Sequence, residues 1–216
     1  MTDTIDFRDK FKKFGGEFIP DIIKYLEDRI EEDPGITITV GCDSLQLRRK
    51  TVYALTIMLY NGDVRRGAHV VFHRISCAKI RENQERLYKE AQYLHDLGTF
   101  IHDNLEPNYI RKDLTDFERK SYKYHLAKCA GEYSHVPQHQ EEGVIKNMLL
   151  TPADLMDFKL VDIHVDFNPF EGINGKNKSH VAYKSFVPWL RGLGFRVWGK
   201  PLAHASTTAA DLLLKG

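Results

Sequence analysis

The sequence predicts an α/β domain, and three features of its pattern predict it. Three strand-like runs precede a long amphipathic helix, two further strands are each followed by a helix, and another helix comes before them all. Of the 216 residues, 42% are hydrophobic and 28% are charged, which is ordinary for a globular chain. This length suits one sizeable domain that carries an insertion. We therefore expect a single domain over residues 1–216.

The N-terminal half is expected to contain a helix, three strands and a second helix. Isoleucine and leucine recur at helical spacing over residues 18–31, and Pro34 and Gly35 cannot continue that helix. The strand-like runs that follow cover residues 36–42, 51–60 and 67–75. Residues 61–63, Asn-Gly-Asp, are typical of a hairpin turn, so we expect an antiparallel meander. An amphipathic helix then covers residues 87–105.

The C-terminal half returns to a regular pattern after a looser segment. Residues 104–157 mix polar and aromatic side chains, and we interpret them as a helical insertion or lid. Strand and helix then alternate, at residues 159–167, 179–193, 195–199 and 206–214. The expected total is five strands.

Composition limits the functions that this chain could serve. No apolar run approaches the roughly 20 residues that span a bilayer, and the first residues are polar and acidic, so we expect a cytoplasmic protein that binds no membrane. Three widely spaced cysteines, Cys42, Cys77 and Cys129, predict neither a disulfide framework nor a zinc knuckle. A net charge of +1 argues against coating nucleic acid by bulk charge, but it allows a local basic groove.

Four carboxylates occupy positions where an acid is costly without a partner: Asp43, Glu90, Asp166 and Asp211. Asp43 ends the first apolar strand, and Asp166 lies in the fourth. Glu90 falls on the apolar stripe of the long helix, and Asp211 enters the last helix. A buried carboxylate without a partner would normally take up a proton. A shared divalent metal site would remove that cost for all four.

Two of these positions also have a structural interpretation. In the fourth strand Asp162, His164 and Asp166 share one face, which indicates either a site or an edge strand wetted on that face. Residues 208–211, Thr-Ala-Ala-Asp, match a capping box, and capping is the stronger interpretation of Asp211 taken alone.

Acting together, the four acids would supply hard oxygen ligands, which Mg²⁺ and Mn²⁺ prefer. Thr39 and Gly41 share the face of Asp43 on the first strand. We expect these small residues to leave room above the sheet for ions and a phosphate.

Several short motifs, in order along the chain, resemble one known family. Residues 40–46 read Val-Gly-Cys-Asp-Ser-Leu-Gln, residues 163–166 read Ile-His-Val-Asp, and residues 200–211 run from Lys-Pro to Ala-Asp. They resemble the YkuK-like family of predicted ribonuclease H-related nucleases, over nearly the whole chain except the insertion. Cys42, where threonine is usual, and the bulky residues 167–172 depart from the family pattern.

The resemblance implies a fold, an activity and a site. The fold would be a ribonuclease H-like mixed five-stranded sheet, three antiparallel strands and then parallel strands, flanked by helices, with an N-terminal helix and a helical insertion. The activity would be two-metal hydrolysis of phosphodiester bonds in nucleic acid at a DEDD carboxylate site. Asp43 would bridge two Mg²⁺ or Mn²⁺ ions. Glu90 and Asp166 would complete the shell of one ion, and Asp211 would help hold the other.

Other residues are candidates for supporting roles. His164 would orient a ligand or relay a proton, unless it is a satisfied core histidine. Lys200 would contact phosphate, and His204 would assist product release by analogy with ribonucleases H. The candidates for substrate binding are Ser44, Arg48, Arg49, Lys200 and His204.

Two other functions fit the same residues. One is a catalytically silent ribonuclease H-like module that binds nucleic acid or protein through the insertion. The other is metal-dependent hydrolysis of a nucleotide or another phosphate ester. RNA, DNA or a hybrid as substrate, endo- or exonucleolytic cleavage, and any oligomeric state are all compatible with the sequence.

Overall fold

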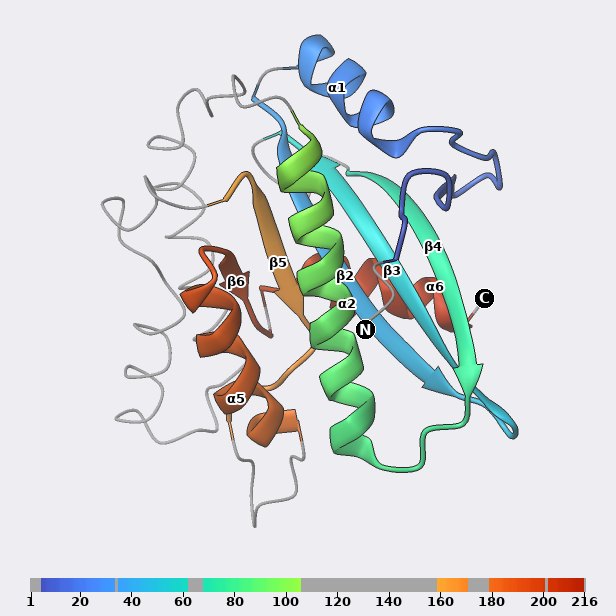
Figure 1. Ribbon diagram of the computed structural model, residues 1–216, viewed down its shortest axis with the longest axis vertical. Coiled ribbons are helices and arrows are strands. Elements are labelled where there is room, and N and C mark those ends of the chain that lie inside the picture. The colour runs from blue at the N-terminus through green and yellow to red at the C-terminus, as the bar shows by residue number, and fades with distance from the viewer. Residues whose placement is uncertain are drawn as a thin grey trace.

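The computed structural model describes residues 5–33, 35–61, 68–105, 159–170, 179–200 and 202–215. In these residues a six-stranded sheet has the order β1-β4-β3-β2-β5-β6, with helices on both faces (Figure 1). The strands are β1 (Lys12–Lys13), β2 (Thr37–Gln46), β3 (Lys50–Tyr60), β4 (His69–Ala78), β5 (Val161–Val165) and β6 (Arg196–Trp198).

The sheet is mixed, as the sequence predicts. The β2-β3 and β3-β4 pairs are antiparallel, whereas β5 pairs with β2, and β6 with β5, in parallel. The predicted count of five strands is wrong by one, because β1 adds a sixth at the edge, with Lys12 opposite Phe72. A strand of two residues is too short to show the alternation that marks a strand in a sequence.

The helices are α1 (Ile22–Glu32), α2 (Asn83–Asn104), α5 (Ser179–Gly192), the π-helical turn η4 (Ala205–Ala210) and α6 (Asp211–Lys215). α1 begins four residues later than predicted because Asp21 caps it, its carboxylate accepting hydrogen bonds from the amides of Ile23 and Lys24. α2 and α5 lie on one face of the sheet, and α6 lies behind the other (Figure 1).

The main hydrophobic core lies between the sheet and the helices of the α2 face. Leu94 and Ile101 of α2 pack there with Val40 of β2 and Ile163 of β5, all nearly or fully buried. A smaller cluster on the opposite face joins Ala54 of β3 to Ala210 and Leu213. The two clusters fix α2 and the η4–α6 segment on opposite sides of the same strands.

The parallel strands β2 and β5 stop pairing at one point. Their last partners are Cys42 and Val165, beyond which β2 continues to Gln46 paired only with β3. From β2 the chain crosses to β3, and from β5 it crosses to β6 on the other side. In α/β sheets a crevice at the carboxyl ends of strands that diverge in this way is the usual place for a ligand.

Some sequence predictions fall outside the described residues: Gly62 and Asp63 of the predicted hairpin turn, nearly all of the insertion at 104–157, and part of the motif at 167–172. Cys42 and Cys77 are free thiols. Within the described ranges, every helix is too short or too polar to cross a membrane.

Candidate active site

Asp43 and Asp166 sit side by side where β2 and β5 part. Each follows directly after the last paired residues, Cys42 and Val165. Neighbouring strands are about 4.8 Å apart, so the two carboxylates share the carboxyl edge of the parallel pair. The amide of Ser44 donates a 2.7 Å hydrogen bond to Oδ1 of Asp43. The end of the β2–β5 ladder therefore brings together two acids that are far apart in the sequence.

Glu90 reaches the same edge from α2. Its side chain is 2% exposed and accepts a hydrogen bond from the Ser44 hydroxyl. The Arg86 guanidinium, one helical turn earlier, lies 3.1 Å from Oε1 of Glu90 and also donates to the Ser44 hydroxyl. Ser44 thus contacts Asp43 through its amide and Glu90 through its hydroxyl. Sequence reasoning missed Arg86, although its i, i+4 spacing from Glu90 was a usable signal.

Asp211 approaches from the opposite face of the sheet. It begins α6, and its carboxylate accepts a 2.6 Å hydrogen bond from Nζ of Lys215. The capping-box interpretation is wrong, because the helical segment already starts at Ala205 and Thr208 lies inside it. Asp211 is an acid of the helix body, 34% exposed at its side chain.

The pKa values show that the four positions are electrostatically coupled. Burial, together with repulsion from Asp166 and Asp211, raises the pKa of Asp43 to about 6. Burial and repulsion from Asp43 raise the pKa of Glu90 to about 8. Burial also raises the pKa of Asp166, although Lys200 lies 2.9 Å from its carboxylate and opposes the shift. Negative charge is therefore in excess at this point of the molecule.

The space above Gly41 is filled, and the expectation of room for ions there is wrong. A Cβ atom on Gly41 would lie 2.4 Å from the backbone carbon of Ala205, so η4 rests directly on β2. The hydroxyl of Thr56 donates a 2.9 Å hydrogen bond to the carbonyl of Ala205 and fixes that contact. Glycine at this position permits close backbone approach. The segment η4 therefore occupies the space above Gly41.

The polar stripe of β5 divides into two parts. Asp162 is buried and forms an ion pair with Arg196 at 2.6 Å, and its other oxygen accepts from the Trp198 indole at 3.2 Å. Nδ1 of His164 accepts a 3.1 Å hydrogen bond from the amide of Ala205. The edge-strand alternative is wrong, because β6 pairs with β5 on that side. Only Asp166, at the end of the stripe, belongs to the acidic cluster.

The remaining candidates occupy three places. Ser44 and Lys200 contact members of the acidic cluster. Arg48 and Arg49 are exposed in the tight turn between β2 and β3. His204 is half-buried and directly precedes η4.

The donor set suits a hard divalent cation. In the described residues no group of three or more acidic, histidine or cysteine side chains is arranged to hold a metal ion, and three of the acids pair instead with Arg86, Lys200 and Lys215. Carboxylate oxygens are nonetheless the ligands that Mg²⁺ and Mn²⁺ prefer. Burial is the largest cause of the raised pKa values of Asp43 and Glu90 and repulsion between acids adds to it, so a bound cation would favour the charged forms of both. The carboxylate chemistry of Asp43, Glu90, Asp166 and Asp211 is therefore compatible with such an ion.

Comparison with known proteins gives one match. The model of a family described as ribonuclease H-like matches residues 17–126, about half of the chain. The matched range contains α1, the meander β2-β3-β4 and α2, and with them Asp43 and Glu90. Neither the curated proteins nor the solved structures gave a match.

Proposed function

This chain belongs to the ribonuclease H-like family, and we propose that it is a metal-dependent nuclease. It would hydrolyse phosphodiester bonds of nucleic acid at the cluster of Asp43, Glu90, Asp166 and Asp211. One observation carries the proposal: four acids from β2, α2, β5 and α6 are coupled at the point where the parallel strands part. The motifs shared with the YkuK-like nucleases support the same assignment.

The chemistry would be divided among the four acids and their neighbours. When bound, two Mg²⁺ or Mn²⁺ ions would activate the attacking water and stabilise charge on the leaving oxygen. Asp43 would contact both ions, since its carboxylate is coupled to those of Asp166 and Asp211. Glu90 and Asp166 would hold one ion, and Asp211 the other.

Two further side chains would support the reaction. Ser44 would orient Asp43 and Glu90 through its amide and hydroxyl. Lys200, 38% exposed and paired with Asp166, would donate to a phosphate oxygen of the substrate. His164 would act indirectly, because its hydrogen bond to the Ala205 amide helps seat the segment that carries Asp211.

A catalytically silent binding module is the alternative. Such a module gains nothing from acids that repel one another, since burying Glu90 with a raised pKa disfavours its charged form. A metal site does gain from the same arrangement, because a divalent ion would balance the charge of the acids. Charge repulsion at the cluster therefore favours the nuclease.

A cleavage assay tests the proposal. End-labelled RNA, DNA and RNA–DNA hybrid would be incubated with the protein in Mg²⁺, Mn²⁺ or EDTA. We expect metal-dependent cleavage of at least one substrate, lowered about 10²- to 10³-fold in Asp166→Asn, the scale for loss of one group that stabilises the transition state. Glu85→Gln, an exposed acid of α2, serves as the matched control and should retain activity. Cleavage that persists undiminished in Asp166→Asn would assign the activity to another site or another protein.

A further inference from the structure

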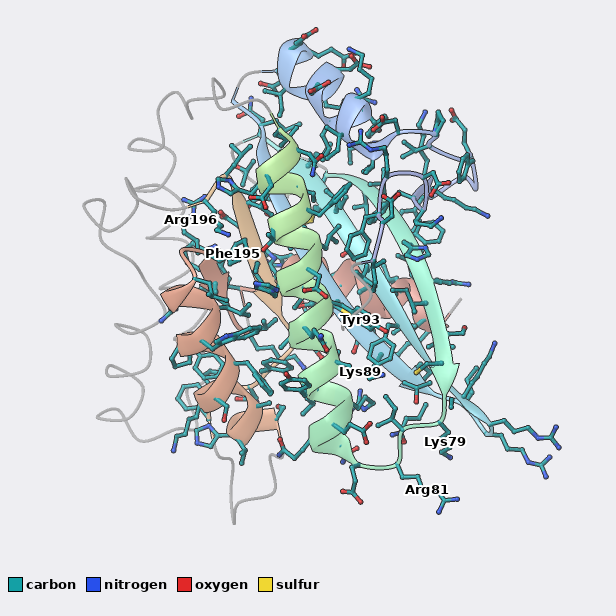
Figure 2. The ribbon with its side chains drawn as sticks, in the orientation of Figure 1. Lys79, Arg81, Lys89, Tyr93, Phe195 and Arg196 are labelled. Carbon is teal, nitrogen blue, oxygen red and sulfur yellow. The ribbon has the colours of Figure 1, made fainter. Side chains whose placement is uncertain are left out.

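A cationic surface lies at the far end of β2, beyond the acidic cluster. Five exposed basic residues form it, and we call it the hairpin platform: Arg48, Arg49, Lys50, Lys79 and Arg81. Arg48 and Arg49 belong to the turn between β2 and β3, Lys50 begins β3, and the other two belong to the link between β4 and α2. None of the five has an ion-pair partner within the part of the chain that the structure describes. Figure 2 shows Lys79 and Arg81 projecting from that link, at the end of β4.

Ile80 joins the two halves of the hairpin platform into one unit. Its carbonyl accepts a 2.7 Å hydrogen bond from Nε2 of Gln46, and its amide donates a 3.0 Å hydrogen bond to the Thr51 hydroxyl. The Ile80 side chain is buried, at 6% exposure. Lys79 and Arg81 flank this anchored residue, and Ala78 pairs with Lys50 in the ladder. The five cations are therefore held together by the fold rather than scattered on mobile side loops.

The turn that carries Arg48 and Arg49 extends from β2, the strand that also carries Asp43. Gln46, at the base of the turn, is three residues beyond Asp43 on β2. At about 3.3 Å per residue, this places the base of the turn roughly 10 Å from Asp43. A helical nucleic-acid strand advances about 3.4 Å per nucleotide, so the separation corresponds to about three nucleotides.

Charge explains why a nuclease would need such a surface. The acidic cluster repels phosphates, so affinity for a polyanion has to come from elsewhere on the molecule. The whole chain carries a net charge of only +1, which supplies no general attraction. The five cations of the hairpin platform would provide local attraction to phosphate.

We infer that the hairpin platform binds the phosphates of one nucleic-acid strand on one side of the scissile bond, about three nucleotides from the acidic cluster. The position of the scissile bond rests on the proposed function. Binding of the strand by the hairpin platform does not, because it depends only on the five cations.

Fluorescence anisotropy with labelled 20-nucleotide single-stranded RNA and DNA, in EDTA and over a range of KCl concentrations, tests the inference without cleavage. Two double variants change the hairpin platform, one carrying Arg48→Glu with Arg49→Glu and the other Lys79→Glu with Arg81→Glu. The matched control combines Lys12→Glu of β1 with Lys184→Glu of α5, exposed lysines with no ion-pair partner among the described residues. All three variants change the net charge equally.

We expect each platform variant to raise the Kd at least about ten-fold and to flatten the salt dependence, by about 0.7 in log–log slope for each lost phosphate contact. The control should stay within about two-fold of the wild type. If reversal prevents folding, as seen by circular dichroism, the variant with Arg48→Gln and Arg49→Gln gives the same test with a smaller change in charge.

Three outcomes would overturn the inference: a wild type that binds neither probe, platform variants that bind as the wild type does, and a control that loses as much affinity as they do. A wild type that binds as expected but never cleaves would contradict the proposed hydrolysis and leave the hairpin platform supported.

Discussion

The polar stripe that runs along β5 and one residue beyond it has an acid at each end, Asp162 and Asp166, and the two acids have opposite surroundings. At the start, Asp162 has one guanidinium partner and one indole partner, and its negative charge is balanced by Arg196. At the end, Asp166 has Lys200, but it shares its surroundings with three other carboxylates. The two residues are four apart in the sequence: Asp162 lies in β5, and Asp166 directly follows it.

The comparison shows that burial of an acid does not by itself identify a functional site. Asp162 lies where β6 continues the sheet, and its ion pair fixes that neighbour in place. Asp166 lies just beyond the end of the β2–β5 ladder, where no further strand pairs among the residues that the structure describes. Repulsion among several acids, rather than burial alone, separates the candidate site from the structural pair.

Breaking the structural pair should have the largest effect on stability. Asp162→Ala leaves the buried Arg196 without its partner and should lower the free energy of unfolding by about 3–5 kcal/mol. Asp166→Asn, at the other end of the stripe, should leave stability unchanged or raise it, because a repulsive charge is lost. Urea denaturation of both variants measures the contrast, and the reverse order would remove the distinction between the two ends.

Gly41→Ala should have the next largest effect, because the added methyl group would push η4 away from β2. The added methyl would lie 2.4 Å from the backbone of Ala205, which has to move. Overpacking of this kind costs about 1–3 kcal/mol, and cleavage should fall because Asp211 follows the displaced segment.

The matched control for that variant is Gly192→Ala at the end of α5, where a new Cβ would meet nothing within 4 Å. Urea denaturation and cleavage assays would compare the two glycines. A Gly41→Ala variant as stable and active as the wild type would show that η4 does not rest on β2.

The response of stability to pH is the most gradual effect, because it is spread over several pH units. Asp43 and Glu90 have pKa values of about 6 and about 8 in the folded chain, above their ordinary values of 3.8 and 4.5. Between about pH 4 and pH 8 the folded state thus holds more protons than the unfolded state, so metal-free stability should fall as pH rises. The slope should be at most about 1.4 kcal/mol per pH unit for each group.

Divalent metal should change this response to pH. Mg²⁺ or Mn²⁺ bound to the charged carboxylates should flatten the slope and raise the melting temperature, and Asp43→Asn should weaken both responses. Melting curves from pH 4.5 to pH 8, with and without metal, measure them. Stability that rises with pH in the metal-free protein would mean that the acids do not repel one another.

Periodicity predicted much of this structure from the sequence. The period of two in β2 and β5 and the helical period in α2 were enough to bring Asp43, Asp166 and Glu90 to the strands and face that they occupy. Periodicity therefore indicated the positions of three of the four acids, the family resemblance added Asp211, and a metal site shared by all four stays a prediction.

The remaining errors concern partners that are distant in sequence. A glycine such as Gly41 can leave room for a ligand or admit another backbone, and only the position of η4 decides between them. Asp162 looks like Asp166 until Arg196 is seen beside it, 34 residues further along the chain. A local sequence pattern predicts which face of a strand or helix a side chain occupies, but not which residues it contacts there.

Direct measurement of bound metal tests the central claim, that the four acids form one metal site. Electron paramagnetic resonance would count the Mn²⁺ ions held by the wild type, by Asp43→Asn and by the control Glu85→Gln. We expect two ions per chain in the wild type and in the control. In Asp43→Asn we expect loss of at least one ion, or about ten-fold weaker binding. A wild type that takes up no Mn²⁺, or an Asp43→Asn variant that takes up as much as the wild type, would contradict the claim.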